Sequence, residues 1–92
     1  MSVLVNIGFG NTVNNDKVLA VVGPEAAPVR RMIAAARESG TVIDATQGRK
    51  TKAVIVLEDG RLLLSALQPE TIMRRFNAGA AAAIGQEEET VE

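Results

Sequence analysis

Three short segments of the 92-residue chain are apolar on both faces of the strands that they predict, at residues 17–22, 53–57 and 62–67. A strand in an antiparallel sheet with one face in water alternates apolar and polar residues, and these three do not. Both sheet faces therefore need a cover, yet the rest of the chain predicts only one main helix and one short helix. A domain of this size buries about 65% of its unfolded surface. We therefore expect a homo-oligomer, in which further copies cover the second face, rather than a small sandwich that covers itself.

The main helix is predicted over residues 28–39. Pro28 suits the first helical position, where its missing N–H costs nothing. One apolar stripe follows from residues spaced at i, i+3, i+4 and i+7, namely Val29, Met32, Ile33 and Ala36. Gly40 is well placed to end the helix.

The remaining pattern predicts further strands over residues 2–7 and 41–45, with a turn at residues 8–11. Asp59-Gly60 is a strong two-residue hairpin signal between two of the apolar strands. A short C-terminal helix is predicted over residues 69–77. The fold class is thus α+β, with a small, mainly antiparallel sheet. Residues 1–77 form one domain, and residues 78–92 form a disordered tail, because an Ala/Gly run followed by an acidic run cannot bury a face.

The absence of Cys and His from the chain excludes several classes of site. Zinc sites, iron–sulfur clusters, disulfides, thiol nucleophiles and histidine acid–base schemes all need these residues. We therefore expect no metal, no cofactor and no enzymatic activity. The first residues lack the basic start and long apolar core of a signal peptide, and no apolar run reaches the roughly 18 to 20 residues that span a bilayer. A cytoplasmic protein without a membrane partner is expected.

The net charge of −1 conceals an uneven distribution of charge. All ten basic residues lie between Lys17 and Arg75, whereas residues 79–92 contain four acidic residues and no basic one. Residues 1–78 therefore combine ten basic with seven acidic residues, a formal charge of +3. A mildly basic domain with an acidic tail can bind a polyanion.

A basic loop is predicted between two strands, at residues 46–52. Gly48 permits a tight turn at its tip, and three of the next four residues are the cations Arg49, Lys50 and Lys52. Arg forks onto phosphate oxygens, Lys acts as a point charge, and hydroxyl and turn N–H groups complete such sites. The loop therefore favours phosphate binding, although a merely solvated basic loop has the same composition.

Other candidate contacts are weaker. Lys17 extends the positive patch only if the start of its strand lies beside the loop. Arg30 and Arg31 lie opposite the apolar stripe of the helix. The simpler interpretation is a solvated helix face, and the alternative is a secondary contact to the backbone of a nucleic acid. Asp44 and Thr46 are assigned to turn hydrogen bonds, and an enzyme would need a pocket lined by this pair.

The rest of the sequence argues against base-specific reading. Phe9 and Phe76 are the only aromatic residues, too few for the stacking platforms of single-strand binders. The arginines of the main helix lack Asn or Gln companions at helical spacing. Recognition of the backbone and shape of a nucleic acid remains.

The residues that carry these features resemble the RemA family, small bacterial proteins described as extracellular-matrix regulatory proteins. The resemblance runs in register from about residue 3 to residue 76 and is clearest at residues 5–11, 24–33, 43–54 and 65–71. It implies a cytoplasmic DNA-binding transcriptional regulator that activates matrix or biofilm genes. It also implies a ring-shaped homo-oligomer with a basic rim, around which double-stranded DNA curves. The DNA-contacting basic positions of the family fall on Lys17, Arg49 and Lys50.

Two other functions remain open at this point. The same charges suit a ring that binds RNA, and a non-catalytic scaffold that binds protein would not need the basic loop at all. No small-molecule substrate is predicted. The first hypothesis is an oligomeric DNA-binding regulator that uses Lys17, Arg49, Lys50 and Lys52 on phosphates.

Overall fold

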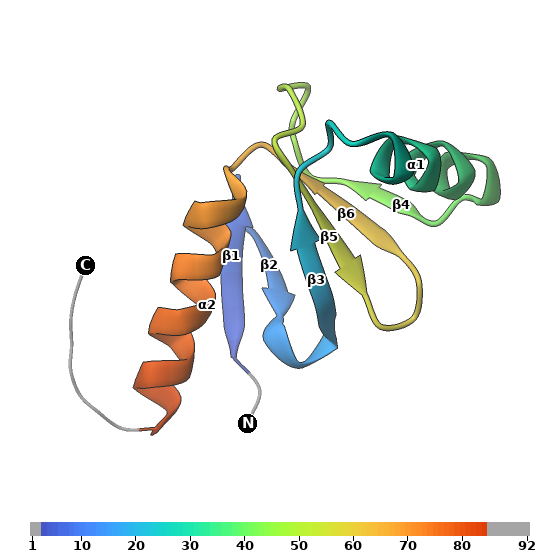
Figure 1. The fold of residues 1–92 in the computed structure, drawn as a ribbon. Helices are drawn as coiled ribbons and strands as arrows, with labels where there is room; N and C mark the ends of the chain where they lie inside the picture. Colours follow the sequence, from blue (N-terminus) through green and yellow to red (C-terminus); the bar gives the residue numbers. More distant parts are fainter. Residues whose placement is uncertain (1–2, 85–92) are drawn as a thin grey trace.

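A four-stranded sheet forms the centre of the computed structural model, which describes residues 3–84 (Figure 1). Its strands are ordered β3 (Val18–Val22), β5 (Ala53–Leu57), β6 (Leu62–Ser65) and β4 (Val42–Asp44). The pairs β3–β5 and β5–β6 are antiparallel, whereas the edge strand β4 runs parallel to β6. The α+β class and the mainly antiparallel sheet are thus confirmed, with one parallel pair that the sequence did not predict.

A second, two-stranded sheet is made by β1 (Leu4–Gly8) and β2 (Asn11–Asn14). The strand β2 was not predicted, because three of its four residues are polar. Its one apolar residue, Val13, is buried and lies opposite Val5 of β1. A 3₁₀ turn, η1 (Asn15–Lys17), then leads into β3.

Helix α1 (Ala27–Ser39) forms where the apolar stripe predicted it. Pro28 lies in the first turn, and Gly40 ends the helix in the left-handed conformation at φ 74°. The stripe packs Ala36, Val29 and Ile33 onto one face of the central sheet, against the even-numbered residues of β5 and β6.

Helix α2 (Pro69–Ile84) is longer than the predicted helix over residues 69–77. Its second half is the Ala-rich segment that was interpreted as the start of a tail. That interpretation considered only the lack of a face to bury, whereas Ala has the highest intrinsic helix propensity. The acidic end of the predicted tail, residues 85–92, lies outside the described residues.

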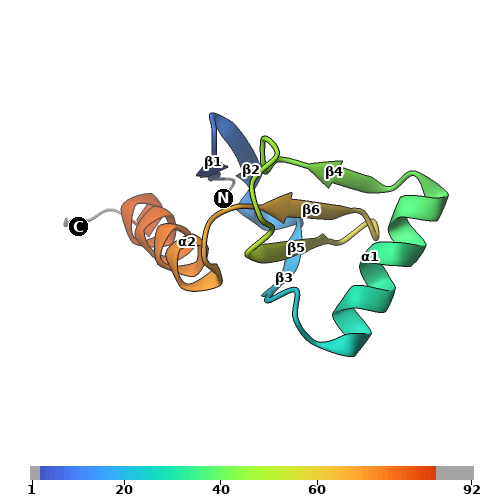
Figure 2. The ribbon, with the colours of Figure 1, turned by 90° about the horizontal axis from the view of Figure 1, so that it is seen from above.

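The second face of the central sheet is covered by the same chain (Figure 2). The buried cluster there joins the β1–β2 hairpin to β5, β6 and α2, and consists of Val5, Ile7, Val13, Ala45, Ala53, Ile55, Leu57, Leu63 and Ile72. The expectation that further copies must cover β5 and β6 is therefore wrong, because the unforeseen hairpin does so. Large apolar residues remain exposed at several places, and the two most exposed are Leu4 of β1 at 70% and Leu19 of β3 at 69%.

Candidate nucleic-acid interface

The tip of the basic loop is a type I′ β-turn over residues 46–49. The N–H of Arg49 donates to the carbonyl oxygen of Thr46 at 3.0 Å. The two central residues, Gln47 and Gly48, have φ values of 55° and 78°, as this turn requires. The predicted tight turn at Gly48 is thus confirmed, and Gln47 shares its left-handed conformation.

Both ends of the loop are hydrogen-bonded to β6. The N–H of Ala45 donates to the carbonyl oxygen of Leu64 at 2.9 Å, and the N–H of Lys52 donates to that of Ser65 at 2.8 Å. Arg49 and Lys50 therefore stand on a loop whose two ends are anchored to the sheet.

Asp44 and Thr46 support the turn through hydrogen bonds to each other, as the sequence predicted. One carboxylate oxygen of Asp44 accepts from the N–H of Thr46 at 2.9 Å and from its hydroxyl at 2.6 Å. The hydroxyl bond contributes most to holding the pKa of Asp44 below its usual value, with a smaller contribution from the positive charge of Arg37. Thr46 is 2% exposed. The pair is a structural support for the loop and does not line the cavity described below.

Three exposed cations follow the turn: Arg49, Lys50 and Lys52. In the described part of the chain, no carboxylate lies within ion-pair distance of any of them. Their charges are available to an external anion.

The guanidinium of Arg49 lies over the ring of Phe9, with its central carbon 5.6 Å from the ring centroid. Phe9 lies in the turn between β1 and β2, at the same end of the sheet as the basic loop (Figure 1). The sequence predicted a turn at residues 8–11, but it gave Phe9 no role beyond being one of too few stacking residues. Gly8 and Gly10, which flank Phe9, were the sequence feature that could have indicated an unusual turn at this ring.

Lys17 lies at the other end of the sheet. Its Nζ is 3.3 Å from Oε1 of Glu58, in an exposed ion pair, and its carbonyl oxygen accepts from the N–H of Glu58. Strand β5 separates the two ends, since it starts beside Lys52 and ends beside Glu58. Five residues of strand span about 16 Å. Within one chain, the structure does not bring Lys17 to the basic loop.

Arg30 and Arg31 are exposed in the first half of α1. The helix starts shortly after β3 ends at Val22, which lies opposite Val54 in the sheet register. The two arginines thus belong to the half of the molecule that carries the basic loop, on the α1 side of the sheet.

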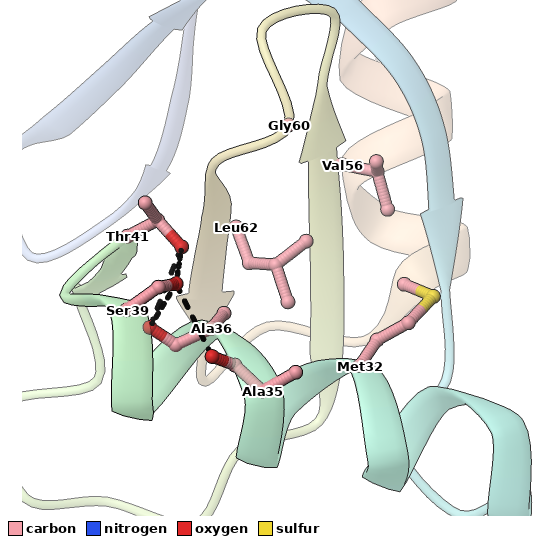
Figure 3. A pocket seen from close by; sticks show the side chains of 8 residues that line it. All are labelled: Met32, Ala35, Ala36, Ser39, Thr41, Val56, Gly60 and Leu62. Carbon is pink, nitrogen blue, oxygen red and sulfur yellow. Dashed lines mark hydrogen bonds between the residues drawn. The ribbon is translucent and has the colours of Figure 1, made fainter.

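A cavity of about 350 Å³ opens between α1 and the β5–β6 hairpin (Figure 3). It is lined by Met32, Ala35, Ala36, Ser39, Thr41, Val56, Gly60 and Leu62. The hydroxyls of Ser39 and Thr41 bond to each other and to carbonyl oxygens near the end of α1. The cavity therefore offers an apolar lining without a titratable group.

Residues 3–84 contain no group of three or more acidic side chains arranged to hold a metal ion. Within the same residues, no helix combines the length and apolar character needed to cross a membrane.

Comparisons with known proteins match the chain to one family. The family model described as "RemA-like: Extracellular matrix regulatory protein A-like" matches residues 4–76. A protein of Lachnoclostridium phytofermentans is 58% identical over 77 residues, which cover 84% of this chain and 85% of that protein. A protein of Symbiobacterium thermophilum is 51% identical over 86 residues, covering 94% and 90%. Both are named "putative regulatory protein". The family match spans the basic loop, Phe9 and Lys17.

Proposed function

Because the chain belongs to the RemA-like family, whose name and relatives indicate regulation rather than catalysis, we propose that it is a regulator that binds the backbone of double-stranded DNA. One observation carries this proposal. A hydrogen-bonded type I′ turn presents Arg49 and Lys50, and Lys52 follows two residues later in the sequence. No carboxylate of the described chain forms an ion pair with any of the three side chains.

The chemistry of this loop suits phosphates better than bases. Arg49 can donate two parallel hydrogen bonds to a phosphate, and Lys50 adds a point charge. Such contacts position a protein on a duplex without reading its sequence directly. Preference among DNA sequences then arises from the ease with which each sequence bends.

One copy of the loop makes too few contacts for firm binding at physiological salt. Repetition of the loop in an oligomer makes the later contacts intramolecular, and avidity can raise affinity by roughly 10² to 10⁴. The proposed DNA binding thus depends on self-association.

The edges of the central sheet support self-association. Strand β3 pairs only with β5 in the described chain, and its free edge carries the exposed Leu19. The opposite edge strand, β4, carries Ile43, which is 42% exposed. Exposed apolar edge strands favour pairing with another chain. Contact between the β3 edge of one copy and the β4 edge of the next is head-to-tail, and such contacts close into rings when the rotation permits.

Lys17 lies at the end of the sheet away from the basic loop, so Lys17 and Arg49 of one chain do not form one patch. In the proposed oligomer, the loop cations of different copies share one curved duplex, and Lys17 is proposed as an additional contact to DNA. Arg30 and Arg31 are proposed as secondary contacts on the same DNA.

The test removes the two cations at the loop tip. In the variant with Arg49→Ala and Lys50→Ala, binding of a duplex at physiological salt, measured by fluorescence anisotropy, is expected to be lost, with the oligomer size unchanged in light scattering. The matched control carries Arg61→Ala and Arg74→Ala, which remove the same charge from exposed positions outside the loop. The proposal fails if both double variants weaken binding equally. Preference for single-stranded RNA over the duplex in competition would replace DNA by RNA as the ligand.

A further inference from the structure

Phe9 occupies a backbone conformation that an aromatic residue rarely adopts. Its φ is 54°, and it lies between Gly8 at 112° and Gly10 at 77°. A bulky side chain at positive φ is strained, and such strain persists only where the surrounding structure imposes it. Phe9 is half exposed, so burial of its ring in the core does not explain why the strain is tolerated.

Three hydrogen bonds hold the turn around Phe9. The N–H of Gly8 donates to the side-chain oxygen of Asn6 at 2.7 Å, and the side-chain amide of Asn11 donates to the carbonyl oxygen of Gly8 at 3.0 Å. The buried hydroxyl of Ser65 donates to the carbonyl oxygen of Ile7 at 2.8 Å, which ties the hairpin to β6. The backbone that carries the ring is thus held relative to the sheet.

The neighbour of this ring is Arg49. The guanidinium lies over the ring face at 5.6 Å, within the range of a cation–π interaction. A ring engages only part of a guanidinium, which carries five N–H donors, so N–H groups of Arg49 remain to donate to a phosphate. Both Arg49 and Phe9 are exposed, so the pair can be reached from solvent.

We propose that Phe9 is a positioning residue, which holds the guanidinium of Arg49 while N–H groups remain for a phosphate of the bound DNA. This inference rests on the proposed function and adds to it the reason for the strained turn. By limiting the rotamers of Arg49 before binding, the ring lowers the entropy lost when the side chain is ordered on the phosphate. Lys50 lacks a planar group, so an equivalent ring would not orient it.

The strain at Phe9 allows a test that separates positioning from folding. Phe9→Asn places there a residue that tolerates positive φ, so the free energy of unfolding is expected to stay equal or to rise. Affinity for a duplex is expected to fall about two- to fivefold for each engaged copy, the size of an exposed cation–π contact. Phe9→Tyr keeps the aromatic face and should retain the affinity of the unmodified protein.

A double-mutant cycle with Arg49→Ala shows whether Phe9 acts through Arg49. At low salt, where weak binding is measurable, Phe9→Asn should weaken the unmodified protein but add no further loss to the Arg49→Ala variant. An equal loss in both backgrounds would mean that Phe9 contacts DNA directly, and it would overturn the positioning role. No loss in either background would also overturn it. If Arg49→Ala itself leaves affinity unchanged, the proposed function fails as well.

An NMR measurement on the free protein checks the contact without DNA. The ring current of Phe9 is expected to shift the side-chain protons of Arg49, and the shift should vanish in the Phe9→Asn variant and persist in Phe9→Tyr. Random-coil positions for these protons in the unmodified protein would contradict the contact between the ring and the guanidinium.

Discussion

The single charge of Asp44 supports the basic loop by accepting hydrogen bonds from Thr46. Its carboxylate accepts both donors of Thr46, and this lowers its pKa below the ordinary 3.8. A carboxyl group with a lowered pKa in the folded state adds stability that is fully present above the unfolded pKa. That stability is lost as the pH falls through the folded value.

The first prediction concerns Asp44→Asn, which keeps an acceptor oxygen but removes the charge. The variant is expected to be less stable than the unmodified protein at neutral pH, because hydrogen bonds to a charged acceptor are about twice as strong. The difference should shrink as the pH falls below about 4. Urea unfolding at a series of pH values measures it, and a difference that does not change with pH would contradict the account.

The second prediction concerns Lys17, whose charge is partly engaged by Glu58. Glu58→Gln frees Lys17 and is expected to raise affinity for a duplex about two- to fivefold for each contacting copy, the worth of an exposed ion pair. The adjacent Asp59 provides the control, since it pairs with Arg61 and not with Lys17. If Asp59→Asn raises affinity by the same amount, Lys17 makes no specific contact.

At the scale of elements, the β1–β2 hairpin links the core to the proposed interface. Its connection to β6 passes through Ser65, which is completely buried, donates to the carbonyl oxygen of Ile7 and accepts from the N–H of Leu67. Ser65→Ala leaves both groups without this partner. The third prediction is a loss of about 1–3 kcal/mol in the free energy of unfolding.

Hydrogen exchange should localise the effect of Ser65→Ala. Amides of β1 and β2 are expected to lose more protection than those of β5, because the hairpin is released from the sheet. Ser39→Ala is the control, since Ser39 is an exposed serine whose hydroxyl bonds to carbonyl oxygens of α1 and to the hydroxyl of the nearby Thr41. Equal destabilisation by the two variants would show that the buried bond has no special role.

The elements that could be predicted from sequence are those with a strong local signal. Pro28, the apolar stripe and Gly40 define α1, and unbroken apolar runs define β5 and β6. Strand β2 has no such signal, because its stability comes from pairing with β1 and from one buried residue, Val13. The parallel pairing of β4 with β6 is a property of strand order, which no local pattern encodes.

The candidate site was predictable to a similar extent. Loop position, charge and Gly48 are all local features, and they led to Arg49, Lys50 and Lys52. The contact between Phe9 and Arg49 joins residues forty positions apart and depends on how the hairpin docks, so composition alone could not reveal it. The distance of Lys17 from the loop likewise follows from the direction of β5.

At the scale of the whole molecule, the two free sheet edges determine how copies can join. If the contact is head-to-tail, as proposed, Leu19→Glu damages one side of it and Ile43→Glu the other. The fourth prediction is that either variant alone is smaller than the unmodified oligomer in light scattering, with weaker DNA binding. An equimolar mixture should form dimers but no larger ring, because each variant keeps one intact edge.

A different outcome would point to a different symmetry. If Ile43→Glu leaves the oligomer unchanged while Leu19→Glu abolishes it, copies join through two β3 edges, and the contact is a two-fold one. That contact alone closes as a dimer and would contradict the ring.

The central claim is that repeated loop cations bind DNA phosphates, and the salt dependence of binding tests it most directly. The logarithm of the association constant falls with the logarithm of salt concentration, with a slope of about −0.9 for each neutralised phosphate. The account predicts a steep slope for the unmodified oligomer, and one shallower by about two for each engaged copy in the variant with Arg49→Ala and Lys50→Ala. Equal slopes for the two proteins would contradict it.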